Sequence, residues 1–203
     1  MNIERRAPPG AKMSQRDRDI ETLMAAAEAG GPGAALAARR AAWLAEARDP
    51  ARAAQALQLA ARLEPLDAAP RLALSRLHAE AGELDAAKRE AQSVIADAVD
   101  EAARARAHFM LGEIARLQGE AKAAREAFLA VERIEEKLLQ ADRMNPHAAR
   151  WLARANGRLA ELDAESGARA KARTGAEGAL SLLKAVAAQL SETPALAADI
   201  ADA

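Results

Sequence analysis

The side chains that most often catalyse reactions or bind metals are few in this sequence and far apart. The 203-residue chain has no cysteine, and its three histidines, His78, His108 and His147, are widely separated. No two histidines have the i,i+4 spacing of a helical zinc motif, and none stands beside a carboxylate in such a motif. We therefore expect no metal ion and no thiolate nucleophile, and we interpret the histidines as surface or interhelical side chains.

Other catalytic patterns are absent as well. No serine lies in a nucleophile-elbow motif. The run from Gly30 to Gly33 follows no predicted strand, and Pro32 removes one of the amides that an anion would need, so we read it as a helix breaker. Glu135 and Glu136 are paired carboxylates, which we interpret as part of a solvated helix face with i,i+4 charge pairs. We expect a protein that is not an enzyme and that needs no cofactor.

The charged residues favour a protein partner over a nucleic acid. The 29 basic and 30 acidic residues give a formal net charge of −1, whereas nucleic-acid binders neutralise phosphates with excess basic residues. Arg150, Arg154 and Arg158 recur at i,i+4 and form a basic cluster that would attract an acidic partner or a nucleic acid. Trp151 is the only aromatic residue near this cluster, and single-strand binders usually need several stacking platforms.

The elements that must position these residues are all predicted to be helices. The chain has 60 alanines, only 2% aromatic residues and no tyrosine, which favours helices over strands. No apolar run is long enough to span a membrane, and the N-terminus does not resemble a secretory signal. These features, with the absence of cysteine, predict a cytoplasmic protein. Capping and breaker residues predict helices over residues 14–29, 34–47, 50–64, 70–82, 84–98, 100–119, 121–143, 145–166 and 168–190, a last short helix from Thr193, and disorder over 1–13.

A short turn motif repeats along these helices. Gly82-Glu83 recurs as Gly119-Glu120, and a step of similar length back from Gly82 reaches Arg48-Asp49. The same steps connect small residues in the flanking helices, among them Ala53, Ala87 and Ala124. Such a period is typical of stacked helix pairs. We therefore predict three units, at residues 34–67, 68–104 and 105–147.

The third unit resembles the tetratricopeptide repeat (TPR). Leu111-Gly112 pairs a large and a small residue where two helices cross, Gly119 supplies the turn, and Ala124 and Phe128 have the family's positions in the second helix. The resemblance implies an all-α fold, a right-handed superhelical array of antiparallel helix pairs (an α-solenoid). Residues 14–33 are then an N-terminal helix and breaker, and residues 148–203 are capping helices. A fourth unit after residue 147 is an alternative.

The resemblance also implies a function, because the first helices of TPR units line a groove that binds a peptide or helix of another protein. We therefore expect an adaptor or scaffold. The chaperone-tail clamp of some relatives is not expected, since only Arg106 matches its basic and asparagine residues. Two alternatives are a self-assembling structural protein that forms homo-oligomers and an accessory domain of a separate enzyme. The predicted groove residues are Arg39, Ala42, Glu46, Leu72, Arg76, Glu80, Arg106, Phe109, Glu113 and Arg116.

Overall fold

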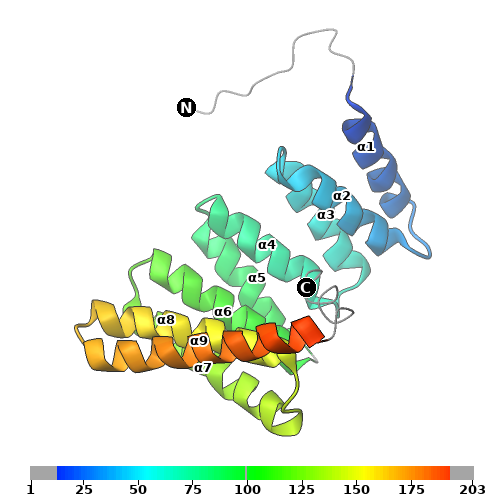
Figure 1. The fold of residues 1–203 in the computed structure, drawn as a ribbon. Coiled ribbons are helices and arrows are strands. Elements are labelled where there is room, and N and C mark those ends of the chain that lie inside the picture. The colour runs from blue at the N-terminus through cyan, green and yellow to red at the C-terminus, as the bar shows by residue number, and fades with distance from the viewer. Residues whose placement is uncertain (1–12, 99, 193–203) are drawn as a thin grey trace. The chain divides into compact units, whose positions relative to one another are not determined.

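The computed structural model describes residues 13–98 and 100–192 (Figure 1). The predicted last short helix and nearly all of the segment predicted to be disordered lie outside the described residues. Within the described ranges every regular element is an α-helix, so the predicted all-α fold is confirmed. The helices are α1 (Gln15–Glu28), α2 (Ala34–Glu46), α3 (Pro50–Leu63), α4 (Ala68–Glu80), α5 (Leu84–Asp97), α6 (Glu101–Leu117), α7 (Ala121–Ala141), α8 (Pro146–Glu165) and α9 (Arg169–Glu192).

Several helices begin at the capping residues that the sequence indicated. The Ser14 hydroxyl accepts a hydrogen bond from the Asp17 amide at 3.2 Å, and the Asp17 carboxylate accepts one from the Ser14 amide at 3.3 Å. This reciprocal pair is a capping box. Side-chain oxygens of Asp49, Asp100 and Asn145 cap α3, α6 and α8 in a simpler way.

The same glycine turn joins three of the helix pairs. Gly82, Gly119 and Gly167 have φ values of +78°, +75° and +83°, a region that favours glycine. In each turn the glycine amide donates to the carbonyl three residues back, and the next amide donates to the carbonyl five residues back. The turns at Gly82 and Gly119 lie where the sequence repeat places them. The third turn, at Gly167, joins α8 to α9.

The chain divides into two compact units, residues 1–70 and 71–203. In the first unit, α1 packs against α2 and α2 packs against α3. Its core includes Ala27, Ala38, Leu59 and Ala60, with Met24 packed beside them. Alanines at these contacts let the helix backbones approach closely, which explains how so few large side chains hold the unit together.

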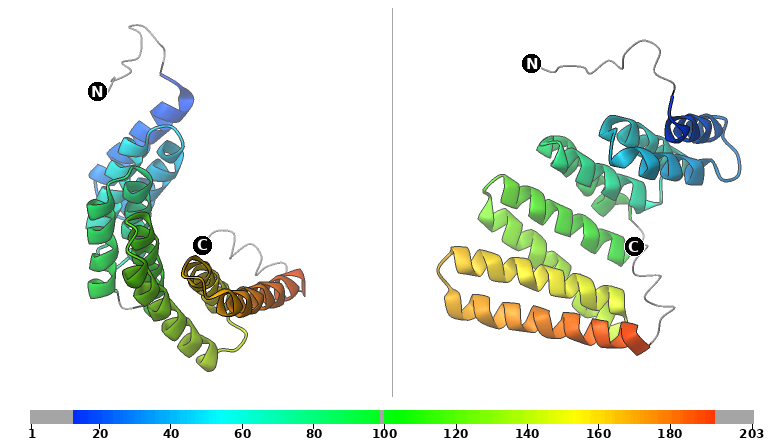
Figure 2. Two further views of the ribbon diagram at one scale, coloured as in Figure 1. Left: turned by 90° about the vertical axis from the view of Figure 1, so that its left-hand side faces the viewer. Right: turned by 45° about the horizontal axis from the view of Figure 1, so that its top comes forward.

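In the second unit, consecutive helices from α5 to α9 pack against one another (Figures 1 and 2). Its core contains larger side chains, with Phe109, Phe128 and Trp151 in contact. A Cβ added to Gly112 would lie 2.5 Å from Cε1 of Phe128, so only glycine fits this crossing. Ala124 is fully buried in the same cluster. Gly112, Ala124 and Phe128 therefore meet at a close helix crossing, as their places in the repeat lead one to expect.

The last two helices, α8 and α9, lie side by side and run in opposite directions (Figure 2). A Cβ added to Gly175 of α9 would lie 3.3 Å from the Cβ of Ala160 on α8. The glycine thus stands at a close contact between the two helices, and α9 continues through it. α8 and α9 are thus joined by a glycine turn like those at Gly82 and Gly119 and pack closely against each other.

None of the described helices combines the length and apolar composition needed to cross a lipid bilayer.

Candidate functional site

The predicted groove residues of the first unit, Arg39, Ala42 and Glu46, are on α2. The Arg39 guanidinium lies 3.0 Å from a carboxylate oxygen of Glu64 and also forms an ion pair with Asp67. Both acidic residues follow α3, so Arg39 connects α2 to the chain after α3. Arg39 is therefore already matched by two carboxylates, which makes it a structural residue as well as a candidate for binding. The prediction that Ala42 lines a groove was wrong, because its side chain packs inside the unit and is only 4% exposed.

Three predicted groove residues, Leu72, Arg76 and Glu80, are on α4 in the second unit. Leu72 is half-buried and Glu80 is exposed. Arg76 and Glu80 form an i,i+4 ion pair of 2.8 Å along the helix surface. An exposed pair of this kind contributes only a few tenths of a kcal/mol, about 0.3–0.5, to the helix.

Phe109 on α6 was expected to lie exposed on the surface of an open groove, but the structure buries it. Its side chain is only 4% exposed, because the ring fills the space between α7 and α8. It makes edge-to-face contacts with Phe128 at 5.3 Å and with Trp151 at 5.2 Å between ring centroids. The expectation of an exposed apolar spot at Phe109 was wrong. The ring instead supports polar side chains that lie over it.

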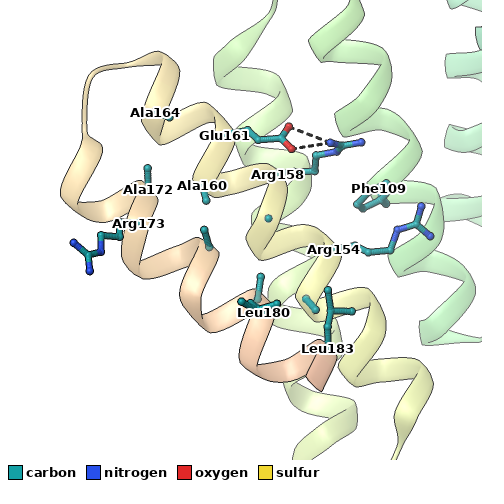
Figure 3. A pocket seen from close by; sticks show the side chains of 14 residues that line it. Phe109, Arg154, Arg158, Ala160, Glu161, Ala164, Ala172, Arg173, Leu180 and Leu183 are labelled. Carbon is teal, nitrogen blue, oxygen red and sulfur yellow. Dashed lines mark hydrogen bonds and ion pairs between the residues drawn. The ribbon is translucent and has the colours of Figure 1, made fainter. Parts of the chain in front are cut away.

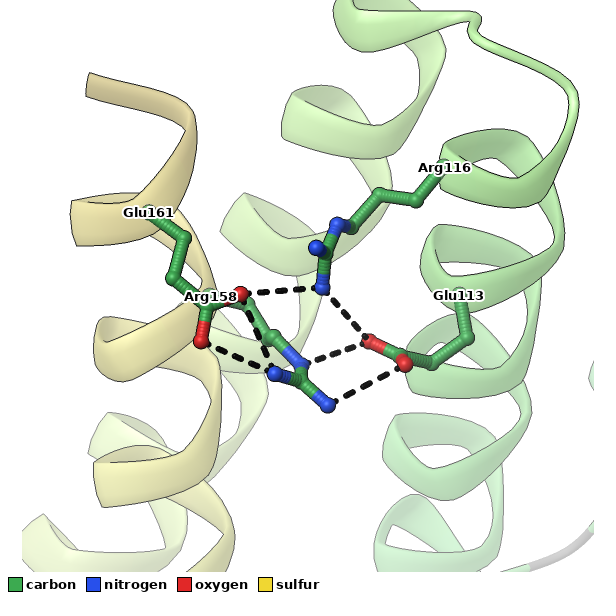
Figure 4. A network of polar contacts seen from close by, with 4 residues as sticks. All are labelled: Glu113, Arg116, Arg158 and Glu161. Atoms are coloured by element: carbon green, nitrogen blue, oxygen red, sulfur yellow. Dashed lines mark hydrogen bonds and ion pairs between the residues drawn. The ribbon is translucent and has the colours of Figure 1, made fainter. Parts of the chain in front are cut away.

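Glu113 and Arg116 on α6 belong to a network of four charged side chains with Arg158 and Glu161 on α8 (Figure 4). The Arg158 guanidinium contacts Glu113 at 2.8 Å and 3.2 Å, and Glu161 at 2.9 Å and 3.0 Å. Arg116 reaches Glu161 at 2.9 Å. Burial lowers the pKa of Arg158, but the charges and hydrogen bonds of Glu113 and Glu161 raise it by more. The network therefore fixes α6 and α8 side by side and neutralises its own charges.

Arg154, one turn before Arg158, has a different environment. Its guanidinium lies over two aromatic rings, 4.6 Å from the centroid of Trp151 and 5.2 Å from that of Phe109. Burial is the main factor that lowers its pKa, and the neighbouring charges of Arg150 and Arg158 add to the effect. Among the described residues no carboxylate lies within ion-pair distance of Arg154, although the nearby charge of Glu113 opposes the lowering of its pKa. Glu113 itself forms its ion pair with Arg158, so Arg154 is a positioned cation with no ion pair of its own.

A groove lies beside this arginine, between α8 and α9, with a volume of about 720 Å³ (Figure 3). Leu180 and Leu183 of α9 form one wall and are 51% and 44% exposed. Arg154, with Phe109 beneath it, lies at another edge. The remaining lining is made largely of small residues that leave the space open, namely Ala153, Gly157, Ala160, Ala164, Ala172, Ala176 and Ala179. We call this space the α8–α9 groove.

The α8–α9 groove was only partly foreseen from the sequence. The sequence indicates the i,i+4 arginines, and Phe109 does line the groove, but Leu180 and Leu183 are not among the predicted groove residues. The alternative fourth unit, with its turn at Gly167, is the sequence signal for this groove, because it assigns α8 and α9 to one helix pair. Of the other predicted residues, Arg106 is half-buried on α6 and is not among those that line this groove.

Glu135 on α7 was wrongly predicted to be solvated, although its neighbour Glu136 is exposed. The Glu135 side chain is only 1% exposed, because it continues the buried stripe of Phe128 and Val131 at helical spacing. Neither carboxylate oxygen has a hydrogen-bond partner. Burial raises the pKa of Glu135 to about 7, against the opposing charge of Arg106.

The histidines have ordinary structural environments. His78 Nδ1 lies 2.6 Å from a carboxylate oxygen of Glu83 in the turn after α4. Burial, followed by the charges of Arg133 and Arg104, lowers the pKa of His108. Among the described residues, no three acidic or histidine side chains are grouped so that they could hold a metal ion. The histidines therefore do not add a metal-binding group to the α8–α9 groove, whose lining is made mostly of leucines, alanines and charged side chains.

Solved structures with a similar fold are found despite low sequence identity. No family model matches the sequence, and no curated protein is significantly similar to it. A crystal structure of MamA aligns with a TM-score of 0.61 at 18% identity, covering 86% of this chain and 98% of that one. A second MamA structure aligns with a TM-score of 0.55 at 16% identity, covering 87% and 96%. MamA is a TPR-like helical protein, so the likeness shows that this chain has a TPR-like fold.

Proposed function

We propose that this protein is a non-catalytic interaction scaffold and that the α8–α9 groove receives a segment of a partner protein. The single observation that carries the proposal is the pairing of exposed leucines with an unmatched arginine around one open groove. Binding sites are typically concave and mostly apolar, with a few polar or charged groups placed at the rim. The TPR-like fold supports the same reading, since stacked helix pairs offer extended binding surfaces.

The charged network of α6 and α8 supports the proposal by making this side of the groove rigid. Two ion pairs span the helices, Arg158 of α8 with Glu113 of α6 and Arg116 of α6 with Glu161 of α8, and they hold α8 beside the helix that carries Phe109. A prearranged surface loses less conformational entropy when it binds. The predicted groove residues Glu113 and Arg116 would then act by positioning this surface rather than by contacting the partner.

A test compares two leucine variants of the full chain. Leu183→Asp places a charge in the groove, and Leu117→Asp places the same charge at the end of α6, where Leu117 is 65% exposed and outside the groove. Tagged wild-type protein and both variants are expressed in the native cells, and co-purified proteins are quantified by mass spectrometry. We expect one or more partners to be lost with Leu183→Asp and retained with Leu117→Asp.

Two outcomes would reject the proposal. Equal recovery of every partner by the two variants would remove the groove from the function. Recovery of the chain alone, together with a dimer in light scattering that Leu183→Asp dissociates, would favour the self-assembling alternative. Circular dichroism of both variants checks that the helices remain intact.

A further inference from the structure

We propose that the α8–α9 groove seats an amphipathic helix of a partner protein and that an acidic side chain of this helix pairs with Arg154. The inference deepens the proposed function and rests on it. It specifies the secondary structure and the charge of the occupant, which the fold alone does not. Three features of the second unit support it: the repeat of the helix pairs, the size of the side chains on α9, and the charges around the groove.

The first feature is a repeat of geometry. α8 packs against the α6–α7 pair, where its Ala155 and Leu159 share a buried cluster with Phe128 and Val131 of α7. The α8–α9 turn repeats the α6–α7 turn, with Gly167 in the place of the earlier glycine. The α8–α9 pair therefore has a face equivalent to the face of the α6–α7 pair on which α8 packs. No described helix covers that second face, so its natural occupant is another helix.

The second feature is the size of the groove-lining side chains. When the two turns are superposed in sequence, Ala176 takes the place of Phe128, and Ala179 takes the place of Val131. Phe128 fills the crossing within its own pair, whereas Ala176 leaves open space in the groove. The occupant must therefore bring its own large side chains. A helix with leucine, methionine or phenylalanine at i, i+3 or i+4 would place them over the alanines, which is a common mode of helix recognition.

The third feature is the charge of the groove. Arg158 is matched by Glu113 and Glu161, and Arg173 by Glu177 at 2.8 Å. Among the described residues Arg154 forms no ion pair, because the nearby Glu113 is paired with Arg158, and two rings hold the Arg154 guanidinium in place. A carboxylate from the partner would form charge-assisted hydrogen bonds with it. A basic helix would instead add to the repulsion from the neighbouring arginines of α8.

A nucleic acid fits these features less well than an acidic helix. Phosphate backbones are bound by several cations together. Here the charges of Arg158 and Arg173 are already neutralised, and leucines and alanines form most of the lining. The apolar surface would remain uncovered by a phosphate chain, whereas a helix with an apolar stripe would bury it.

The test selects peptides by display on the intact chain. The probe is a library of helical peptides of about 20 residues, randomised on one face, a length at which an isolated helix begins to be stable. Wild-type protein is compared with Arg154→Gln and with the control Arg89→Gln, which removes an exposed arginine of α5 that does not line the groove. Wild type and Arg89→Gln should enrich the same peptides, with Asp or Glu beside large apolar residues. Arg154→Gln should lose the acidic preference and bind the selected peptides about tenfold more weakly or worse, the factor that corresponds to 1.4 kcal/mol.

A second variant separates the two levels of the proposal. Ala176→Leu fills the groove from within, and binding should be lost while the helical circular dichroism is unchanged. If Ala176→Leu abolishes binding but Arg154→Gln does not, the acidic pairing is wrong and the proposed function stands. If no peptide depends on either residue, both the inference and the groove-based function fail.

Two further results would assign a different occupant and overturn the inference. Peptide selection only by a variant that ends at residue 192 would indicate that the chain's own residues 193–203 occupy the groove. Binding of a single-stranded oligonucleotide in place of the peptides, with the same dependence on Arg154, would indicate a nucleic-acid site.

Discussion

The buried carboxyl of Glu135 should make this protein less stable as the pH rises, and Glu135→Gln should remove that dependence. Its side chain is 1% exposed and neither oxygen has a hydrogen-bond partner, so the ionised form is poorly accommodated. Burial raises its pKa from 4.5 to about 7, while Arg106 opposes the shift and Asp100 reinforces it. Glutamine has nearly the same shape as the protonated acid and cannot ionise.

The sign and size of the effect follow from proton linkage. The folded state holds the Glu135 proton more tightly than the unfolded chain does. The folded state therefore has its full stability below pH 4.5 and loses stability as the pH rises through 7. The difference between 4.5 and about 7 corresponds to about 3 kcal/mol at 1.36 kcal/mol per pH unit. We expect Glu135→Gln to match wild type near pH 4 and to exceed it by up to that amount at pH 8.

Urea unfolding followed by circular dichroism between pH 4 and 8 measures this difference. Subtracting the two proteins cancels other titrating groups, such as His108, whose lowered pKa makes the fold less stable as the pH falls. Parallel pH profiles for wild type and Glu135→Gln would refute the reasoning. They would mean that the carboxylate finds water or Arg106 in the folded state.

Three further predictions concern contacts that shape the second unit. Gly112→Ala should destabilise the protein by about 2 kcal/mol, since the new Cβ would lie 2.5 Å from the Phe128 ring, and calorimetry would detect it; an unchanged melting temperature would contradict this packing. Gly119→Ala should lower the free energy of unfolding by about 1–2 kcal/mol, because alanine is strained at the φ of +75° that Gly119 adopts. A variant as stable as wild type would show that the turn has another conformation. A double-mutant cycle with Arg158→Gln and Glu113→Gln should give a coupling of about 1 kcal/mol or less, since both side chains are partly exposed; a larger value would indicate a more strongly desolvated network.

Much of the fold could be predicted from the sequence because its signals are local. The Gly82 and Gly119 turns depend on one residue that tolerates positive φ, and the capping box at Ser14 depends on a hydroxyl and a carboxylate three residues apart. Such features are encoded within a few positions. They defined the helix boundaries to within a few residues even in a chain with little hydrophobic contrast.

The groove could be predicted less well because it depends on which helix packs on which face. Phe109 and Glu135 both occur on helices with mixed charges, and an alanine-rich sequence leaves their orientation ambiguous. The structure buries both: Phe109 packs between α7 and α8, and Glu135 lies near Arg106 of α6. The long α7 also makes the step from Gly119 to Gly167 longer than the step from Gly82 to Gly119. The fourth unit therefore matches the repeat period less closely than the earlier units, and the sequence offered it only as an alternative to a cap.

Site-specific photo-cross-linking inside cells is the most direct test of the proposed binding groove. The cross-linker p-benzoylphenylalanine replaces Leu180 in the groove or, as the matched control, Leu117 at the end of α6; both leucines are exposed. We expect a cross-linked partner at Leu180 and none at Leu117, with the attachment point in an acidic, amphipathic helical segment of the partner. Cross-links at Leu117 alone, or at both positions to the same degree, would contradict it.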